Sequence, residues 1–263
     1  MKKQLAFLAL ALPALALVWA RFIEPDWLEG VRVTVPTAKL PRGQRFTVAL
    51  LSDLHLEHQT RALTRVQDVL RAERPDLLVH AGDALNDAAA LPLLRRTLGG
   101  LPARLGRYAV RGDHDVRQWG HLDLFAGGPA TELTGGAPVL LEGGALALCG
   151  VPWGAPERAA RCLEAAPPQA FVIFAYHSPE LIETLTPRPH LYLAGHTHGG
   201  QVRVPFFGSL LDRSRFGARY AAGRYEVRNT TLYVSRGLGF TPGSSSLRFG
   251  ARPELTLLTL EGE

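Results

Sequence analysis

The sequence predicts a layered α/β sandwich. From residue 46 onward, short apolar segments rich in Val, Ile and aromatic residues alternate with polar or helical segments, and after residue 200 only strand-like segments remain. Strands interleaved with helices and followed by a run of strands are typical of sheets packed in layers. With 263 residues, the chain is long enough for one large domain and too short for two ample ones.

The first 22 residues differ from the rest of the chain. Lys2 and Lys3 precede an uncharged apolar run, Gln4–Ala20. We interpret residues 1–22 as a signal anchor or a cleavable signal peptide, since the run is near the lower length limit for crossing a bilayer. Aromatic residues flank its end, which favours the anchor, and the lysines then place the start of the chain in the cytoplasm. We therefore expect a membrane-anchored protein whose folded domain is extracytoplasmic.

Residues 23–45 are interpreted as a linker with one short strand, Val31–Val35, and residues 46–263 as the main folded domain. Buried strands are predicted at Phe46–Leu51, Leu77–His80, Tyr108–Val110, Ala145–Cys149, Phe171–Ala175 and Leu191–Ala194. Helices are predicted at Arg61–Ala72, whose apolar residues fall on one face, and at Pro179–Leu185. The last predicted strands are Gln201–Val204, a segment at Tyr220, Tyr225–Val227, Thr231–Ser235 and Leu255–Leu260.

The distribution of charge weighs against nucleic-acid binding, and the spacing of the cysteines weighs against a cysteine metal site. The net charge is +5, but the arginines are scattered rather than clustered, so nucleic acid is not expected as a partner. Cys149 and Cys162 lack the spacing of metal ligands. A disulfide is possible outside the cytoplasm, but two buried free thiols are the expected state.

Side chains that bind metals follow five of the predicted strands. They are Asp53 and His55, then Asp83, then Asp113 with His114 and Asp115, then His177, and finally His196 and His198. Sites in α/β proteins gather beyond the carboxyl ends of strands, so these groups are expected at one rim. Asp53 and His55 are two residues apart, which in extended backbone directs both side chains to one face. Mixed carboxylate and imidazole ligands suit Mn²⁺, Fe or Zn²⁺.

The ordered series Asp-x-His, Gly-Asp, Gly-Asp-His-Asp, His and Gly-His-x-His resembles the calcineurin-like metallophosphoesterase superfamily. The chain is most similar to its bacterial membrane-anchored, YkuE-like branch. The wider shared pattern comprises Glu24-Pro25-x-Trp27-Leu28, Gly195–Gln201, Arg219-Tyr220-Ala221-x-Gly223, Leu232–Gly239 and Arg252-Pro253-Glu254. The likeness covers residues 24–260. It implies a four-layer α/β/β/α metallophosphoesterase sandwich, here preceded by an N-terminal hydrophobic helix, and two divalent metal ions.

The resemblance also implies a role for each candidate residue. One metal would be bound by Asp53, His55 and His198, the other by Asp113, His177 and His196, and both by Asp83. A shared carboxylate offsets the repulsion between two dications, and a hydroxide between them would attack the phosphorus of a phosphodiester, phosphomonoester or pyrophosphate. His114 would assist the leaving group as the catalytic acid, and Asp115 would orient its ring.

One ligand departs from the family pattern. Asn is usual where this chain has Asp113. Both side chains present an oxygen to a metal, but the added negative charge should tighten metal binding and make the metals weaker Lewis acids.

Other polar residues receive structural interpretations or stay open. His80 is expected to be a strand histidine with a local partner, and Asn86 and Asp87 are expected to cap the next helix. The candidates for gripping a phosphate are Arg111, Arg203, Arg219 and Arg236.

We expect a phosphorylated small molecule or lipid, from the membrane or cell envelope, as the substrate of a metal-dependent phosphoric ester hydrolase. One alternative is a lipid hydrolase similar to UDP-2,3-diacylglucosamine pyrophosphatases, which occur in the wider group. Another is a weakly active metal-binding module, suggested by Asp113 but opposed by His114 and Asp115. Nucleic-acid hydrolysis, suggested by the basic composition, is a third. The sequence leaves the oligomeric state and the metal identity open.

Overall fold

The computed structural model describes residues 2–204, 208–209, 217–240 and 247–263. The α-helices are α1 (Lys2–Phe22), α2 (Arg61–Glu73), α3 (Leu91–Gly99), α4 (Asp113–Trp119) and α5 (Arg158–Glu164). The strands are β1 (Glu29–Thr37), β2 (Arg45–Leu51), β3 (Leu77–His80), β4 (Arg107–Ala109), β5 (Thr131–Glu132), β6 (Val139–Leu141), β7 (Leu146–Gly150), β8 (Phe171–Ala175), β9 (Leu191–Ala194), β10 (Arg203–Val204), β11 (Gly208–Ser209), β12 (Gly223–Val227), β13 (Thr230–Val234) and β14 (Glu254–Gly262). Short 3₁₀ turns are η1 (Glu24–Asp26), η2 (Ala88–Ala90), η3 (Glu142–Gly144), η4 (Pro179–Glu183), η5 (His198–Gly200) and η6 (Gly217–Tyr220).

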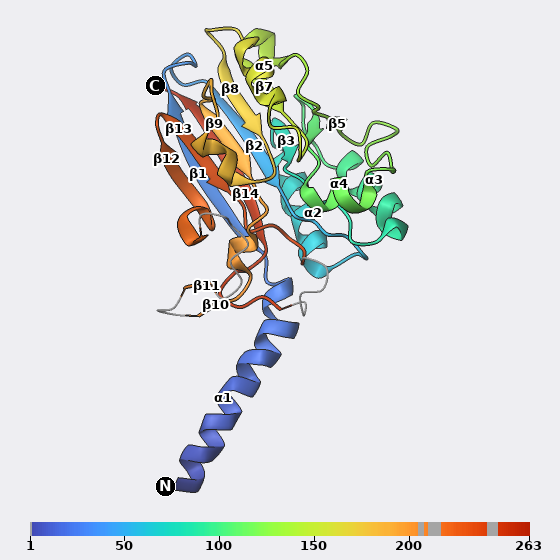
Figure 1. The fold of residues 1–263 in the computed structure, drawn as a ribbon, viewed down its shortest axis with the longest axis vertical. Helices are drawn as coiled ribbons and strands as arrows, with labels where there is room; N and C mark the ends of the chain where they lie inside the picture. Colours follow the sequence, from blue (N-terminus) through green and yellow to red (C-terminus); the bar gives the residue numbers. More distant parts are fainter. Residues whose placement is uncertain (1, 205–207, 210–216, 241–246) are drawn as a thin grey trace.

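Two six-stranded sheets form the centre of the fold (Figure 1). The first has the order β1-β14-β2-β3-β4-β5 and the second the order β12-β13-β9-β8-β7-β6. β2 to β5 run parallel to one another, as do β7, β8, β9 and β13. β14 is antiparallel to β2, and both outer strands of the second sheet are antiparallel to their neighbours. Each sheet therefore delivers the carboxyl ends of several parallel strands to one edge.

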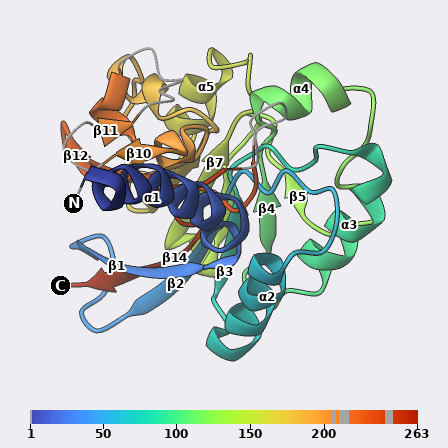
Figure 2. The same ribbon diagram turned by 90° about the horizontal axis from the view of Figure 1, so that it is seen from below.

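The sheets face each other across an apolar core and are covered by helices on their outer faces. Leu50 and Val79 of the first sheet belong to the same core as Ile173 of the second. On the outside of the first sheet, Leu51 packs with residues of α2 and α3, and on the outside of the second, Phe174 packs with residues of α5 and η4. Figure 2 shows α2 and α3 on one side of the sandwich and α5 on the other. The predicted four-layer α/β/β/α arrangement is confirmed.

Local signals explain where α2 begins and ends, and the pairing of strands extends the predicted β1. The hydroxyl of Thr60 accepts a hydrogen bond from Leu63 N and so caps the start of α2, and Arg74 ends the helix in the left-handed conformation. The strand predicted at Val31–Val35 is present, extends from Glu29 to Thr37, and pairs with β14 along this whole length. Tyr220 was expected in a strand but lies in η6, and α3, α4 and α5 were not predicted.

α1 projects from the sandwich in Figure 1. Ala20, near the end of α1, is buried, whereas the side chains of Leu12, Leu15 and Phe22 are exposed. Within the described residues, no helix combines the length and the apolar character needed to cross a membrane.

Cys149 and Cys162 form a disulfide, so the expectation of two free thiols is wrong. Cys149 lies in β7 and Cys162 in α5, which packs on the outer face of the second sheet. Their Cα atoms are 5.9 Å apart, within the range that a disulfide requires. The pairing results from the return of α5 onto its preceding strand, which the spacing of the cysteines does not reveal.

Candidate metal centre

The seven candidate ligands lie together at one edge of the sandwich. Asp53 and His55 follow β2, Asp83 follows β3, Asp113 follows β4, His177 follows β8, and His196 and His198 follow β9. Residues from both sheets meet directly, since Nε2 of His177 lies 3.2 Å from Oδ2 of Asp83. The edge at which the parallel strands of both sheets end is therefore the site of convergence.

Strained backbone is concentrated at these ligands. Of the ten described non-glycine residues with positive φ, five are candidate ligands: Asp53, His55, Asp83, His196 and His198. This conformation costs roughly 1–2 kcal/mol per residue and persists where the surroundings enforce it, often at functional sites. Here Asp53 N donates to Gly82 O at 2.9 Å and His55 N to Asp83 O at 3.0 Å, so the turns after β2 and β3 hold each other. The expectation that Asp53 and His55 share a face through extended backbone is wrong, because a left-handed turn brings them together.

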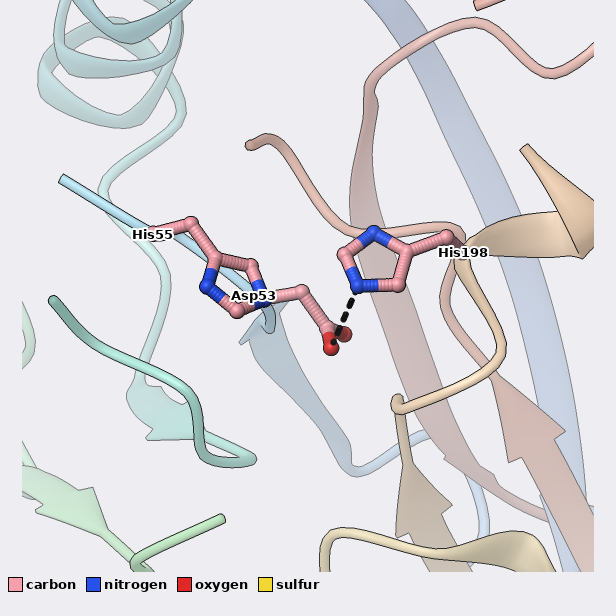
Figure 3. Close-up of side chains that lie close together, drawn as sticks. All are labelled: Asp53, His55 and His198. Carbon is pink, nitrogen blue, oxygen red and sulfur yellow. Dashed lines mark ion pairs between the residues drawn. The ribbon is translucent and has the colours of Figure 1, made fainter. Parts of the chain in front are cut away.

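Three overlapping groups of ligand atoms can be distinguished, with the atoms of each lying within 4.8 Å of one another. They are Asp53, His55 and His198; then Asp113, His177 and His196; and then Asp53, Asp83 and His177. In the first group, Nε2 of His198 is 3.4 Å from Oδ1 of Asp53, beside the ring of His55 (Figure 3). Asp83 Oδ2 lies 3.5 Å from Nε2 of His55 and 3.2 Å from Nε2 of His177. Asp83 thus stands between the first two groups.

Two of the imidazoles are oriented by the protein. Nδ1 of His177 is 2.7 Å from the carbonyl oxygen of Ala81, and Nδ1 of His55 is 2.7 Å from Oδ1 of Asn86. Because both partners accept, each Nδ1 carries a proton, and in the neutral ring each Nε2 directs a lone pair into the cluster. Nε2 of His55 is buried and makes no hydrogen bond within the described part of the chain. A buried lone pair aimed at carboxylates fits a metal ligand.

Asn86 is a supporting residue that sequence reasoning misassigned. It was expected to cap a helix, but it contacts His55 instead, and only Asp87 acts as the predicted cap, accepting from Ala89 N at 2.9 Å. Asn86 also donates through Nδ2 to Glu57 and to the carbonyl oxygen of Phe240, both at 3.0 Å. These bonds fix the orientation of its amide, so its oxygen faces His55.

The cluster of carboxylates attracts positive charge. Burial raises the pKa of Asp53. Burial acts in the same direction on Asp83, but the neighbouring His177 and His55 together outweigh it and lower the Asp83 pKa below its ordinary value. Burial alone would lower the pKa of His177, but Asp83, Asp113 and Asp53 together raise it well above the ordinary value. The carboxylates thus favour a cation at the position of the His177 proton, and a divalent ion can supply that charge.

Asp113 divides its two oxygens between the cluster and the surface. Oδ1 lies 3.1 Å from Nδ1 of His196 and 3.3 Å from Nε2 of His177, and Oδ2 lies 3.0 Å from Nη1 of Arg117. The side chain of Arg117 is 65% exposed, so solvent screens the pair and its contribution is small. The negative charge that Asp113 adds is nevertheless partly balanced, and one oxygen stays directed at the imidazoles. Arg117 was not a candidate, because its i,i+4 spacing from Asp113 matters only once α4 is known.

The two candidate catalytic residues have different surroundings. His114 is half-buried, its ring centre is 5.5 Å from that of His55, and its Nε2 has no hydrogen-bond partner among the described residues. Asp115 is buried and accepts from the N–H groups of Asp83 and Ala84, both at 2.8 Å, and of Gly112 at 3.0 Å. Burial raises the pKa of Asp115 to about 7. Through these three hydrogen bonds the Asp115 carboxylate holds the turns at Asp83 and Gly112. It was expected to contact the His114 ring instead.

Most of the arginines proposed as phosphate ligands are engaged elsewhere. Arg111 pairs with Glu132 at 2.8 Å, and Arg219 pairs with Glu183 at 2.8 Å. Arg236 pairs with Glu29 at 3.1 Å and with Glu254 at 2.5 Å, whereas Arg203 is exposed. Arg111 and Arg236 therefore help to hold the fold together, whereas Arg203 and Arg219 have exposed side chains and stay candidates for phosphate binding.

His80 is buried at the end of β3 and belongs to none of the three ligand groups. The expected local partner is not present, because neither ring nitrogen is hydrogen-bonded to a residue that the structure describes. Burial lowers the pKa of His80 to about 3. The ring is therefore neutral in the folded protein at neutral pH.

Comparison with known proteins places this arrangement in a family. Residues 46–200, which include all seven candidate ligands, match the family described as calcineurin-like phosphoesterase. The metallophosphoesterase YkuE of Bacillus subtilis is 31% identical over 262 residues, covering 92% of this chain and 89% of that protein. The phosphodiesterase YaeI of Escherichia coli is 28% identical over 260 residues, covering 92% of each. The UDP-2,3-diacylglucosamine pyrophosphatase LpxG of Chlamydia trachomatis is 34% identical over 123 residues, which are 44% of this chain and 36% of that protein.

Proposed function

The chain belongs to the calcineurin-like phosphoesterase family and is a metal-dependent phosphoric ester hydrolase, and we propose that it works with two divalent ions. The observation that carries this proposal is the position of Asp83, whose Oδ2 lies within 3.5 Å of an imidazole nitrogen of each ligand group. One carboxylate between two groups of ligands suits a pair of ions that share it. Mn, Fe and Zn all suit the mixed donor set.

The proposed ligands are Asp53, His55 and His198 for one ion, Asp113, His177 and His196 for the other, and Asp83 for both. When bound, the ions supply an activated water and stabilise the negative charge on the phosphoryl oxygens. Asn86 and the carbonyl of Ala81 keep His55 and His177 oriented for this task. His114 donates a proton to the leaving oxygen, a role supported by its half-buried place beside His55 and by its unengaged Nε2.

We propose a phosphodiester or pyrophosphate of the membrane or cell envelope as the substrate. The name of YaeI supports a phosphodiester, and that of LpxG supports a lipid pyrophosphate as the second candidate. Attachment to a membrane through residues 1–22, with the catalytic domain outside the cytoplasm, stays a prediction from the sequence, as does the phosphomonoester as a substrate.

A substrate panel tests both parts of the proposal. The full chain is freed of metal with a chelator and assayed with bis(p-nitrophenyl) phosphate, p-nitrophenyl phosphate and a lipid-linked pyrophosphate, before and after addition of Mn²⁺, Zn²⁺ or Fe²⁺. We expect no turnover without metal, restored turnover with it, and its loss in Asp83→Asn but not in the matched Asp87→Asn. Full turnover after exhaustive chelation would refute the metal mechanism, and tight binding of metal without any turnover would favour the metal-binding module.

A further inference from the structure

Three segments without a candidate ligand meet beside the metal centre. We call them the supporting cluster, defined as residues 19–29, 236–239 and 248–254. Arg236 of the second segment pairs with Glu29 of the first and Glu254 of the third. Arg252 pairs with Glu29 at 2.6 Å and lies over the ring of Trp27, 4.7 Å from its centre. Parts of the wider family pattern that contribute no ligand are thus gathered in one place.

Arg248 is the buried centre of this cluster. Its side chain is fully buried, and Nη1 donates to the carbonyl oxygen of Ala251 at 2.8 Å. Nη2 lies 3.0 Å from the carbonyl oxygen of Arg236, 3.2 Å from that of Gly237 and 2.7 Å from that of Gly239. A buried cation is tolerated only when polar groups replace its lost water, so these carbonyls must stay in place around it. Arg248 therefore fixes the backbone of residues 236–239.

Residues 236–239 in turn contact the turn that carries two candidate ligands. Gly239 N donates to the carbonyl oxygen of Asp53 at 2.7 Å, and Leu238 N approaches the same oxygen at 3.2 Å. The approach is too close for side chains: a Cβ on Gly237 would lie 2.5 Å from Cβ of Asp53, and one on Gly239 would lie 2.7 Å from Cβ of His55. The left-handed turn at Asp53 and His55 is thus supported on this side by backbone that Arg248 holds.

We propose that Arg248 is a positioning residue for the half of the metal centre formed by Asp53, His55 and His198. It acts through the backbone of residues 236–239, which holds Asp53 and His55 in their strained conformation. The inference rests on the proposed function, because it concerns the ions that these ligands bind. Partners outside the ligand set typically change metal affinity about 10- to 100-fold when they are removed.

The supporting cluster also joins the end of α1 to this half of the centre. The backbone N of Arg248 donates to the carbonyl oxygen of Ala20 at 2.9 Å. Glu24 is buried, accepts from Ala251 N at 2.8 Å through Oε1, and accepts from the indole N–H of Trp19 at 3.0 Å through Oε2. A shift of residues 19–24 is therefore expected to disturb the positions of Asp53 and His55 more than that of Asp113.

The test measures metal binding rather than turnover. Metal-free full-length protein is titrated with Mn²⁺ by calorimetry, and the wild type is expected to take up two equivalents. In Arg248→Met, one equivalent should bind as in the wild type, and the other should bind about 10- to 100-fold more weakly. The matched control is Arg252→Met, which removes the same kind of side chain from the same cluster but none of the bonds to residues 236–239. It should retain both equivalents.

Double variants identify the half that Arg248 supports. His55→Ala alone should weaken one equivalent, and addition of Arg248→Met should change little further, because both act on the same half. His196→Ala weakens the other half, so its combination with Arg248→Met should weaken both equivalents. Equal behaviour of the two double variants, or two unaltered equivalents in Arg248→Met, would overturn the inference and leave the proposed function standing. A wild type that binds fewer than two equivalents would refute the proposed function and the inference with it.

A second variant, which acts at the contact itself, serves if Arg248→Met does not fold, as judged by circular dichroism. In Gly239→Ala, the added methyl group meets the turn at Leu54 and His55 directly, and the same single weakened equivalent is expected. Its control is Gly30→Ala, where an added Cβ meets nothing within 4 Å. If Gly239→Ala binds both equivalents as the control does, the contact between residues 236–239 and the ligand turn has no role in metal binding, and the inference is wrong.

Discussion

Asn86 Oδ1 lies 2.7 Å from Nδ1 of His55, and this contact decides which ring nitrogen of His55 faces the other candidate ligands. Asn86→Leu removes the acceptor and leaves the imidazole free to rotate or to change its protonated nitrogen. We expect metal affinity to fall about 10- to 100-fold, measured by competition with a chromophoric chelator. Asn86→Asp keeps an acceptor oxygen and should recover most of the affinity. Equal losses in both variants would contradict the orienting role.

Asp113→Asn is expected to retain activity and to change the metal preference. The amide keeps one oxygen for the metal but removes the charge that Arg117 partly balances at 3.0 Å. The measurement is activity with Mn²⁺, Zn²⁺ and Fe²⁺ in turn, together with metal analysis of the purified protein. Arg117→Met should change the preference little, because solvent screens the pair that Arg117 makes with Asp113. Complete loss of bound metal in Asp113→Asn would show that residue 113 is wrongly assigned.

His80 makes stability depend on pH. Its folded pKa of about 3 lies below its ordinary value of 6.5, so the unfolded chain binds the proton more readily. The free energy of unfolding is therefore unaffected by His80 above pH 6.5 and falls as the pH decreases toward 3. The loss at pH 5 is about 2 kcal/mol. Urea unfolding of metal-free protein at pH 7 and pH 5 should show a smaller acid loss for His80→Leu. The exposed His58, replaced by Ala, should leave the difference unchanged.

The disulfide between Cys149 and Cys162 should contribute to stability through the unfolded chain. It closes a loop across a sequence separation of 13, and loops of about 15 residues are associated with about 3 kcal/mol. Dithiothreitol should therefore lower the free energy of unfolding by about this amount. A variant with Ala at both positions should be insensitive to the reductant, and an equal response of the two proteins would contradict the expectation.

The sequence predicted those features whose cause is local or periodic. The buried strands and α2 follow from apolar spacing, and the structure brings the seven candidate ligands together because each follows a strand that ends at one edge. α4 escaped prediction because it spans only Asp113–Trp119 and begins within the ligand motif itself. The short helices α3 and α5 likewise offer few turns in which a helical period can be recognised.

The features that could not be predicted depend on partners distant in sequence. Arg236 was a phosphate candidate until the fold placed Glu29 and Glu254 beside it. Asn86 and Asp87 look equally suited to capping, and only the return of the chain after β3 to the turn at His55 separates their roles. Arg248 gave no signal in the sequence, because its partners are backbone carbonyls rather than acidic side chains.

The order of strands in the first sheet constrains when this sheet can fold during synthesis of the chain. β14, near the end of the chain, lies between β1 and β2, pairing with the former along its whole length and with the latter from Arg45 to Leu50. While the ribosome is still translating the middle of the chain, β1 has no neighbour and β2 lacks one edge. Such long-range pairing is slow and leaves unpaired edges open to association with other chains. Completion of this sheet must therefore wait until translation of the last strand, and protection of the waiting edges by a chaperone would raise the yield of native enzyme.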